Sequence, residues 1–281
     1  MPRAAGKPEP ARRIRFAGAR DHAPVPRIDL GGQTAIVTGG SRGIGRATVE
    51  ALAGAGAAVV FSYHRHRGAA DEVVARAGAD RVTAVRADVS RARDADRLVE
   101  TARRKHHRVD ILVNNAGIWE PPGGTPFESL SERAWRRTMA INLDGAHLVT
   151  RRVIPLMKRR RSGRIVFVSS TAGQRGEERH GEYAATKGAL IALAKSLAVE
   201  LGQHGILVNA IAPWWVDTDM SHGALVRLRR NRELGRGEWS PLDRVAAPEE
   251  IAGPILFLCS HLSTFVTGEI LNVNGGTILC G

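Results

Sequence analysis

Residues 34–45 read TAIVTGGSRGIG, and this stretch decides the fold. Thr34–Thr38 is a short, mainly apolar run of the kind that forms a buried strand. A glycine-rich turn, Thr38–Gly45, follows directly, and Ile44–Ala55 has the pattern of a helix. Glycines between a strand and a helix allow a tight turn and a close approach to a pyrophosphate, which then rests on the helix N-terminus. A glycine cluster alone is weak evidence, but its place between strand and helix favours a dinucleotide-binding turn.

The alternation of strand and helix continues toward the C-terminus. The predicted strands are rich in Val and Ile and continuously apolar, which indicates burial on both faces of a sheet. Regular alternation with helices indicates parallel pairing through right-handed crossovers. Six more strands are predicted: Ala57–Tyr63, Val82–Ala87, Asp110–Asn114, Arg164–Ser169, Ile206–Ile211 and Ile270–Val273. The later helices are Asp71–Ala77, Ala92–Lys105, one long helix over Ser131–Arg160, Tyr183–Leu201 and Pro248–Leu258. The sequence therefore predicts an α/β fold, a doubly wound parallel seven-stranded sheet of the Rossmann-like kind, with three α/β/α layers in a single domain.

Two segments depart from this rhythm. Residues 1–28 are rich in Pro, Arg, Ala and Gly, and we expect a disordered basic extension before a catalytic domain at 29–281. A transit peptide or a misassigned start codon are the alternatives for this extension. Ser221–Leu242 is polar, with glycines at 223, 235 and 237, and is predicted to be an irregular, mobile segment over the substrate site.

Composition narrows the function classes. Among 281 residues, 43% are hydrophobic and 25% charged, which is typical of a soluble globular enzyme, and no apolar run approaches the roughly 20 residues of a membrane span. Cys259 and Cys280 are the only cysteines, so we expect neither a disulfide framework nor a metal site, and a cytoplasmic location. The net charge of +13 comes from scattered arginines without interleaved aromatic residues, which favours a basic surface over nucleic-acid binding.

The end of the second strand bears on the choice of cofactor. NAD-binding proteins usually carry an Asp or Glu there to hold the ribose 2′-hydroxyl. This chain reads Phe61-Ser62-Tyr63-His64-Arg65 and has no acid. Arg42 in the glycine turn and Arg65 would attract a 2′-phosphate, so NADP(H) is predicted. The alternatives are that both arginines are only solvated, or that the protein accepts both cofactors.

A tyrosine and a lysine four residues apart indicate proton-transfer chemistry. Tyr183 and Lys187 project from one face of a predicted helix. A phenol with a pKa near 10 is a poor base at neutral pH, and a neighbouring ammonium lowers that pKa. Ser170 ends the fifth strand, where its hydroxyl could hold a substrate oxygen. The sequence thus predicts exchange of a proton with an alcohol or carbonyl.

Together these motifs resemble those of the short-chain dehydrogenase/reductase family, in its compact single-domain branch, and within it the 3-oxoacyl-acyl-carrier-protein reductases. The resemblance runs from about Leu30 to Gly276. It is carried by the turn TGGSRGIG, Asp88-Val89, Asn114-Asn115-Ala116-Gly117, Asn142, Ser170, Tyr183, Lys187 and Gly275-Gly276.

The resemblance implies a role for each motif residue. Tyr183 would protonate the substrate carbonyl, Ser170 would orient it, and Lys187 would lower the pKa of Tyr183 and bind the nicotinamide ribose. Asn142 would hold a water that links Lys187 to solvent. Contacts with the cofactor are implied for Gly39, Ser41, Arg42, Gly43, Ile44, Tyr63, Arg65, Asp88, Val89, Asn115, Ala116, Gly117, Tyr183, Lys187, Pro213, Val216 and Thr218. A homotetramer is also implied.

Two positions depart from the family pattern. Trp214 stands where a glycine usually follows Pro213, and Asn274 where many relatives have Asp. Trp214 either stacks in the substrate pocket, favouring a flat substrate, or turns toward solvent or a subunit contact, while Asn274 is expected to affect packing. The function predicted is an NADP(H)-dependent ketoreductase acting on a carbonyl, including one bound to an acidic carrier protein. The alternatives are a dehydrogenase of a sugar, steroid or other secondary alcohol, and a non-catalytic NADP-binding sensor or scaffold.

Overall fold

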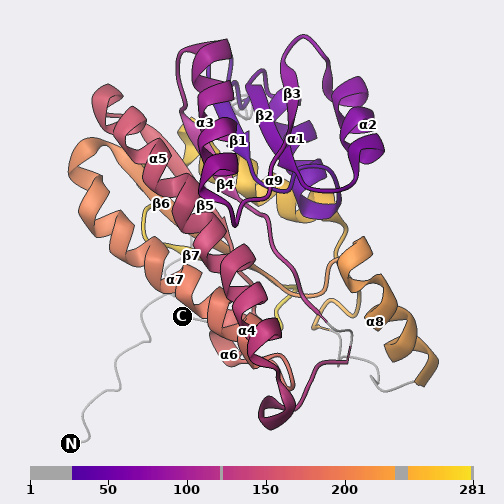
Figure 1. Cartoon of the computed structure of the whole chain (residues 1–281). Coiled ribbons are helices and arrows are strands. Elements are labelled where there is room, and N and C mark those ends of the chain that lie inside the picture. The colour runs from indigo at the N-terminus through magenta and orange to yellow at the C-terminus, as the bar shows by residue number, and fades with distance from the viewer. Residues whose placement is uncertain (1–26, 121–122, 232–239, 280–281) are drawn as a thin grey trace, which may run out of the picture.

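The computed structural model describes residues 27–120, 123–231 and 240–279 (Figure 1). Its centre is a seven-stranded sheet in the order β3-β2-β1-β4-β5-β6-β7, with every neighbouring pair parallel. The strands are β1 (Thr34–Val37), β2 (Ala58–Tyr63), β3 (Val82–Arg86), β4 (Ile111–Asn114), β5 (Gly163–Val168), β6 (Ile206–Pro213) and β7 (Ile270–Val273). The prediction of a doubly wound, parallel seven-stranded sheet is confirmed.

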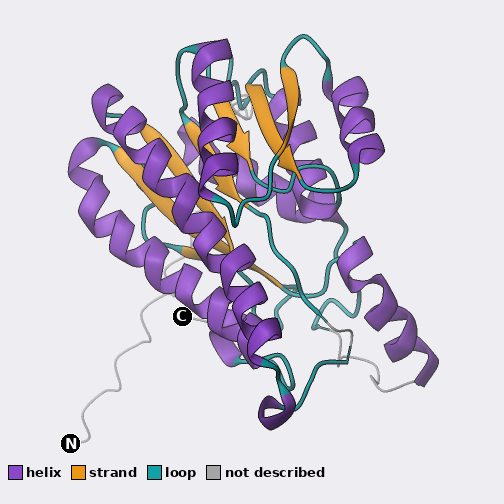
Figure 2. Ribbon diagram, in the orientation of Figure 1, coloured by secondary structure: helices purple, strands orange, loops and turns teal. Residues whose placement is uncertain are grey.

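Helices cover both faces of this sheet (Figure 2). The helices α3 (Ala92–His106), α5 (Gly145–Arg160) and α7 (Gly181–Leu201) pack on one face, where Ile36, Val60 and Leu112 point. The helices α1 (Gly43–Gly54), α2 (Arg67–Ala77) and α9 (Pro248–Cys259) pack on the other face. Successive strand residues point to opposite faces of the sheet and are buried in the hydrophobic core on each face, which is why the strand sequences are continuously apolar.

The strand order reverses at β1, which lies between β2 and β4. Ala35 pairs with Val59 on one side and with Ile111 on the other. Ligands of open α/β sheets bind beyond the carboxyl ends of the strands at such a switch point. The predicted cofactor-binding residues follow the ends of β1, β2, β3, β4 and β6, so the topology gathers them along one edge of the sheet.

The single long helix predicted over Ser131–Arg160 is wrong in its middle. The structure has α4 (Glu132–Met139), a π-helical turn at Ala140–Asp144, and then α5. Wide π-helical turns commonly accommodate a functional side chain. Here the turn contains Asn142, whose side-chain amide forms hydrogen bonds with Ile118 in the loop after β4.

The prediction that Ser221–Leu242 is irregular is also wrong for its first half. Asp219–Asn231 form the helix α8, and residues 232–239 lie outside the described residues. The Ser221 hydroxyl accepts from the Thr218 amide, and the buried Ala224 and Leu225 give the helix its inner face. The glycines at 223, 235 and 237 and the polar residues of this segment obscured the helical pattern in the sequence. The short helix α6 (Ala172–Arg175) was not predicted either.

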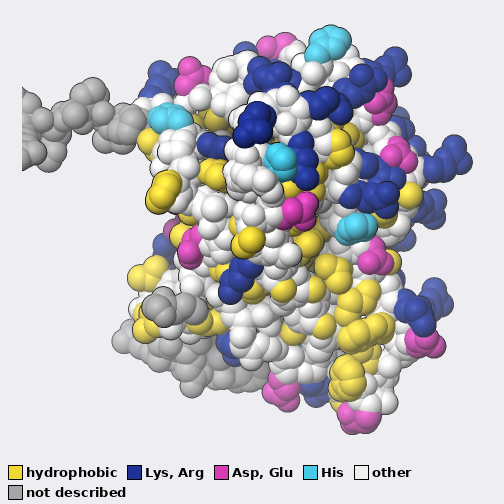
Figure 3. Space-filling model, turned by 90° about the vertical axis from the view of Figure 1, so that its left-hand side faces the viewer, with side chains coloured by type: hydrophobic (Ala, Val, Ile, Leu, Met, Phe, Trp, Pro, Cys, Tyr) yellow, Lys and Arg dark blue, Asp and Glu magenta, His cyan; other side chains and the backbone are white. Residues whose placement is uncertain are grey.

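The surface carries charges of both signs. Figure 3 shows a face on which Lys and Arg side chains are spread widely, with Asp and Glu side chains among them. Several arginines are paired, as Arg103 is with Glu100 and Arg136 with Glu132. Among the helices that the structure describes, none is long and apolar enough to cross a membrane. Of the segment predicted to be a disordered extension, residues 1–26 lie outside the described residues, while Ile28 packs against the core.

Candidate active site

The glycine turn connects β1 to α1. Gly39 and Gly43 adopt positive φ angles of 69° and 51°, which favour glycine. A Cβ atom on Gly45 would lie 2.2 Å from the Gly39 carbonyl oxygen, so only glycine permits this tight turn. Ser41 is buried, and Ile44 packs against the core. The turn therefore places the first residues of α1 at the carboxyl edge of the sheet.

Asn115 and Thr38 hold this turn against β4. The Thr38 hydroxyl accepts from the amides of Asn115 and Ala116 over 2.9 and 3.0 Å. The Asn115 side chain donates to the carbonyl oxygens of Thr38 and Gly39. The contacts that the structure gives Asn115 are thus with the turn itself, and its contact with a cofactor stays a prediction. The Thr38 and Ser62 hydroxyls were not selected from the sequence; Ser62 accepts from the Gly39 amide over 3.0 Å.

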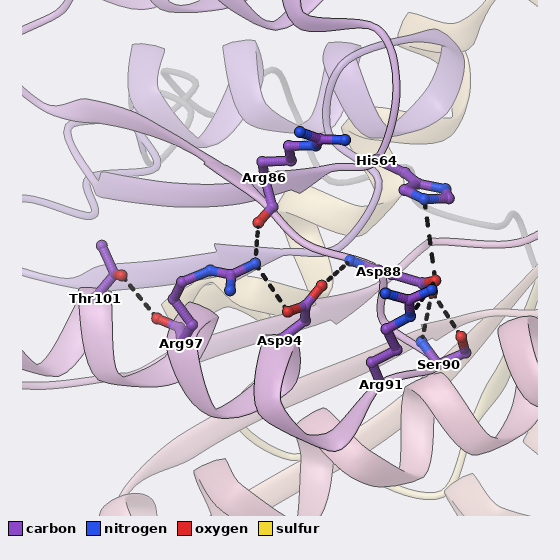
Figure 4. A network of polar contacts seen from close by, with 8 residues as sticks. All are labelled: His64, Arg86, Asp88, Ser90, Arg91, Asp94, Arg97 and Thr101. Atoms are coloured by element: carbon purple, nitrogen blue, oxygen red, sulfur yellow. Dashed lines mark hydrogen bonds and ion pairs between the residues drawn. The ribbon is translucent and has the colours of Figure 1, made fainter.

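The ends of β2 and β3 lie beside the turn. Tyr63 packs against the core, whereas Arg65 is exposed and makes no ion pair among the residues described here. Asp88 follows β3 and lies at the centre of the polar network in Figure 4. Its carboxylate accepts from the Ser90 amide and hydroxyl and lies 4.0 Å from the His64 imidazole.

The charge of Asp88 is supported by these neighbours. Burial opposes its ionisation, but the Ser90 hydrogen bonds and the charges of His64 and Arg91 outweigh burial and lower the pKa of Asp88. Its backbone amide donates to Asp94, which fixes the turn after β3. Val89 is buried, and a Cβ atom on Gly145 would lie 2.7 Å from one of its methyl groups. The segment is therefore locked between β2 and the start of α5.

Ser170 and Tyr183 lie together at the carboxyl end of β5. Their side chains are hydrogen-bonded to each other, and the Ser170 hydroxyl also accepts from the Ala172 amide over 3.1 Å. Burial raises the pKa of the Tyr183 phenol, the Ser170 hydrogen bond opposes that rise, and Glu177 adds to it. The phenol is accordingly protonated at neutral pH, which suits a proton donor.

Lys187 lies one turn after Tyr183 on α7. It is buried, and its ammonium donates to the Val168 carbonyl oxygen over 2.7 Å. The ammonium lies 5.4 Å from the centroid of the Tyr183 ring. Burial lowers the pKa of Lys187 to about 8. That Lys187 lowers the pKa of Tyr183 stays a prediction, because the phenol's pKa is raised in this arrangement.

Asn142 connects the loop after β4 with α7. Its amide oxygen accepts from the Ile118 amide, and its nitrogen donates to the Ile118 carbonyl and to the Thr186 hydroxyl. A Cβ atom on Gly117 would lie 3.3 Å from the Asn142 oxygen and 3.6 Å from the Lys187 ammonium. Gly117 thus lies against both side chains, where a larger residue would be tightly packed. The contact with Thr186 was not foreseen, because it depends on the π-helical turn.

The end of β6 supplies the remaining predicted cofactor residues. The Pro213 carbonyl accepts from Thr171, and Val216 is buried and forms an isolated bridge with Ala246. A Cβ atom on Gly43 would lie 3.0 Å from the Thr218 methyl group. Thr218 therefore lies directly against the glycine turn. Through these contacts the structure brings residues of six strand ends to one edge of the sheet.

An aromatic cluster joins three loops beside the site. Trp119 stacks on His180 with centroids 4.4 Å apart and meets the edge of Trp215 at 5.8 Å. Trp214 meets Trp215 at 5.9 Å, and the Arg175 guanidinium lies 4.5 Å from its ring centroid. Trp214 has no positive φ, so this backbone does not require a glycine. Trp214 and Trp215 line a pocket of about 150 Å³ with Asn274 and Gly275. A contact between Trp214 and substrate stays a prediction.

Glu177 lies between this cluster and α7. The Trp119 side chain is hydrogen-bonded to its carboxylate, and His180 lies 3.8 Å away. Burial raises the pKa of Glu177, although His180, the Trp119 hydrogen bond and Arg175 all oppose that rise. Sequence reasoning missed Glu177, His180 and Trp119, because no local spacing links them.

The edge of the sheet fits a nicotinamide dinucleotide. Among the described residues, α1 begins without a side-chain cap, so the amides of its first turn are available to a phosphate.

Asn274, the other departure from the family pattern, has a packing role, because its side chain forms hydrogen bonds with Gly276 and Ile278. Its expected effect on packing agrees with these contacts.

Comparisons with known proteins point to one family. Residues 39–277 match the family model described as Enoyl-(Acyl carrier protein) reductase. A 3-oxoacyl-[acyl-carrier-protein] reductase of Synechocystis sp. is 39% identical over 253 residues, with 89% of this chain and 98% of the relative covered. The L-rhamnose 1-dehydrogenase (NADP(+)) of Thermoplasma acidophilum is 35% identical, with 90% and 98% covered. The crystal structure of 3-ketoacyl-(acyl-carrier-protein) reductase from Brucella melitensis complexed with NADH has a TM-score of 0.81 and 33% identity, with 89% of this chain and 100% of that chain covered.

Proposed function

The chain belongs to the short-chain dehydrogenase/reductase family of oxidoreductases, and we propose that it is an NADP(H)-dependent ketoreductase that reduces 3-oxoacyl thioesters. The observation that carries the proposal is the hydrogen-bonded pair of Ser170 and Tyr183, with Lys187 buried one turn away. The substrate class is supported by similarity to the 3-oxoacyl-[acyl-carrier-protein] reductase of Synechocystis sp..

In the proposed reaction the protein handles the proton. The nicotinamide, when bound, supplies a hydride to the carbonyl carbon. Ser170 holds the carbonyl oxygen, and the Tyr183 phenol donates its proton to that oxygen as negative charge develops. Because burial keeps the phenol protonated, Tyr183 is prepared for reduction at neutral pH. The Tyr183 phenolate would then regain a proton by way of the Lys187 ammonium.

Lys187 and Asn142 form the proposed path for that proton. Lys187 has a pKa lowered to about 8, so its ammonium gives up a proton more readily than an exposed lysine does. Asn142 lies across Gly117 from the ammonium and is held by Ile118 and Thr186. A water held by Asn142 would connect Lys187 to solvent.

The proposed preference for NADP(H) is supported by charge. The end of β2 has no acid to bind a ribose 2′-hydroxyl, and Arg65 is exposed there without an ion pair in the described structure. Arg42 in the glycine turn supplies a second guanidinium. Two guanidinium groups favour a 2′-phosphate over a hydroxyl.

We further propose a setting for the enzyme. The basic surface would attract an acidic carrier protein that presents the acyl chain. The enzyme would act in the cytoplasm as a homotetramer, through its catalytic domain at 29–281.

A second candidate is the oxidation of a sugar. It is favoured by the 35% identity with the L-rhamnose 1-dehydrogenase of Thermoplasma acidophilum. A sugar would contact polar groups, and Arg244, Glu250 and Asn274 line the pocket beside Trp214.

The test is a turnover assay that follows NADPH and NADH at 340 nm with β-ketothioesters, quinones, sugars and steroids. Turnover with NADPH and β-ketothioesters supports the proposal, whereas sugar oxidation alone supports the second candidate. Tyr183→Phe should lower kcat by roughly 10²–10⁴-fold with unchanged cofactor affinity. Binding of NADPH without turnover on any substrate would support a non-catalytic sensor.

A further inference from the structure

Arg42 in the glycine turn is paired with a residue 177 positions later. Its guanidinium lies 2.9 Å from the carboxylate of Asp219, the first residue of α8. Both side chains are largely exposed, at 47% and 66%. The residue before Asp219, Thr218, packs its methyl group against Gly43. The start of α8 is therefore attached to the phosphate-binding turn by one ion pair and one packing contact.

The segment just before Asp219 is held to Ala246 at the end away from α8. Val216 bridges to Ala246, and the Asp217 amide donates to the Ala246 carbonyl. The Ser221 hydroxyl accepts from the Thr218 amide, which closes the first turn of α8. Asp219 is thus presented to Arg42 by a defined turn. Loss of the ion pair would free the α8 side of that turn, while the contacts with Ala246 hold the side before it.

Arg42 is also one of the two guanidinium groups to which the proposed function assigns the 2′-phosphate. The glycine turn lies beside the end of β2, because the Gly40 amide donates to the Ser62 carbonyl. Arg65 follows three residues after Ser62. An ion pair between exposed side chains is weak, whereas a phosphate dianion offers an arginine several acceptors at once. Asp219 and a 2′-phosphate thus compete for one guanidinium.

We propose that Asp219 is a specificity-determining residue, which competes with the 2′-phosphate of the cofactor for Arg42 and is released with the start of α8 when that phosphate binds. A cofactor without the 2′-phosphate leaves the pair of Arg42 and Asp219 intact. This inference rests on the proposed preference for NADP(H). If the two groups compete, removal of the Asp219 charge strengthens binding of the ligand that carries the 2′-phosphate and leaves binding of the ligand without it unchanged.

The first experiment measures binding of the adenosine half of each cofactor to the full-length protein. Adenosine 2′,5′-bisphosphate and adenosine 5′-monophosphate are titrated by calorimetry into the wild type, Asp219→Asn and Asp217→Asn. Asp217→Asn removes the same charge two residues away, from an exposed side chain. We expect Asp219→Asn to bind the bisphosphate about fivefold or more tightly and the monophosphate unchanged. Asp217→Asn should alter neither affinity appreciably.

A double variant tests whether the effect passes through Arg42. In the Arg42→Gln background, Asp219→Asn should no longer change the affinity for the bisphosphate. Equal tightening for both ligands, or the same gain in Asp217→Asn, would show a general charge effect and overturn the proposal. If the wild type prefers the bisphosphate but Asp219→Asn does not alter that preference, the NADP(H) proposal stands and the competition fails. If the wild type binds both ligands equally, both proposals fail.

Hydrogen exchange supplies a readout that does not depend on affinity. Amides at the start of α8, around Ser221, should exchange faster with saturating bisphosphate than with saturating monophosphate. In Asp219→Asn that difference should vanish, because the segment is already released. Equal exchange with both ligands in the wild type would overturn the release of α8.

Discussion

The Lys187 ammonium donates to the Val168 carbonyl oxygen over 2.7 Å, which ties the middle of α7 to the last residue of β5. The bond is made in a buried place, and burial lowers the pKa of Lys187 to about 8. In the unfolded chain a lysine titrates near pH 10.4. Between these values the unfolded state binds more protons than the native state, so stability should rise with pH.

Lys187→Met should remove this dependence. From pH 8 to pH 10 the wild type should gain stability over the variant by on the order of 1–3 kcal/mol, because only the wild type loses a buried proton. Urea unfolding of both proteins at pH 7, 8, 9 and 10 measures the difference. Parallel curves would show that the Lys187 ammonium is better solvated than its burial indicates.

Gly45→Ala should damage the glycine turn. The new Cβ atom would lie 2.2 Å from the Gly39 oxygen and 2.4 Å from the Asn115 amide nitrogen. We expect a loss of about 1–3 kcal/mol in stability and a weaker affinity for NADPH. Gly54→Ala, at the other end of α1, meets nothing within 4 Å and is the control. Its stability should be unchanged or higher by up to about 1 kcal/mol, and equal effects at both positions would contradict the steric argument.

Asn142→Ala should lower stability and turnover together. The change leaves the Ile118 amide and carbonyl without their partner, which costs about 1–3 kcal/mol. Thr186→Val removes the Asn142–Thr186 bond but keeps the bonds to Ile118. Thermal unfolding and kcat should therefore change less in Thr186→Val than in Asn142→Ala. Larger changes in Thr186→Val than in Asn142→Ala would show that Asn142 acts mainly through its hydrogen bond with Thr186 on α7.

Glu177→Gln should alter the pH dependence of stability in the acid range. Burial raises the pKa of Glu177, so the native state keeps a proton that the unfolded state loses as the pH rises above the normal glutamate value. The wild type should lose stability through that window, and the variant should not. Gln can still accept from Trp119. Melting temperatures from pH 4 to 8 test this. The control is Glu178→Gln, which changes an exposed neighbouring residue and should show the same pH dependence as the wild type.

Trp214→Gly should change substrate choice if the indole contacts substrate. We expect bulkier substrates to gain in kcat/KM relative to flat ones, while cofactor affinity stays constant, because the indole lies against Arg175 and Trp215. Competition assays with paired substrates measure this. An unchanged substrate profile would mean that Trp214 serves only the packing of its loop.

Local patterns in the sequence were sufficient for most of the fold. β1 and α1 begin and end within a residue of their predicted limits, because apolar runs and glycines act over short distances. α8 was missed because Gly223 and the polar residues around Ala224 and Leu225 break up its apolar pattern. The π-helical turn was missed because its hydrogen bond between Asn142 and Ile118 joins two segments that no local pattern connects.

The candidate site divides in the same way. Tyr183 and Lys187 could be identified from the sequence because a spacing of four residues places both side chains on one face of a helix. The pairing of Glu177 with Trp119, and of Arg42 with Asp219, has no local signal, since each pair joins segments that meet only in the folded chain. The raised pKa of Tyr183 likewise depends on burial, which spacing does not report.

The position of β1 inside the sheet also shapes how the chain is made. The Thr34 amide donates to the Asp110 carboxylate, 76 residues later, so one edge of β1 has no ladder until β4 leaves the ribosome. Once β3 has left the ribosome, β3, β2 and β1 can pair, and β1 then presents unpaired backbone N–H and C=O groups along its open edge. Strands of other chains can add to such an edge. After β4 docks, β5, β6 and β7 each add beside the strand made before. The time taken to translate residues 87–114, from the end of β3 to the end of β4, therefore sets the period in which this edge is open to other chains.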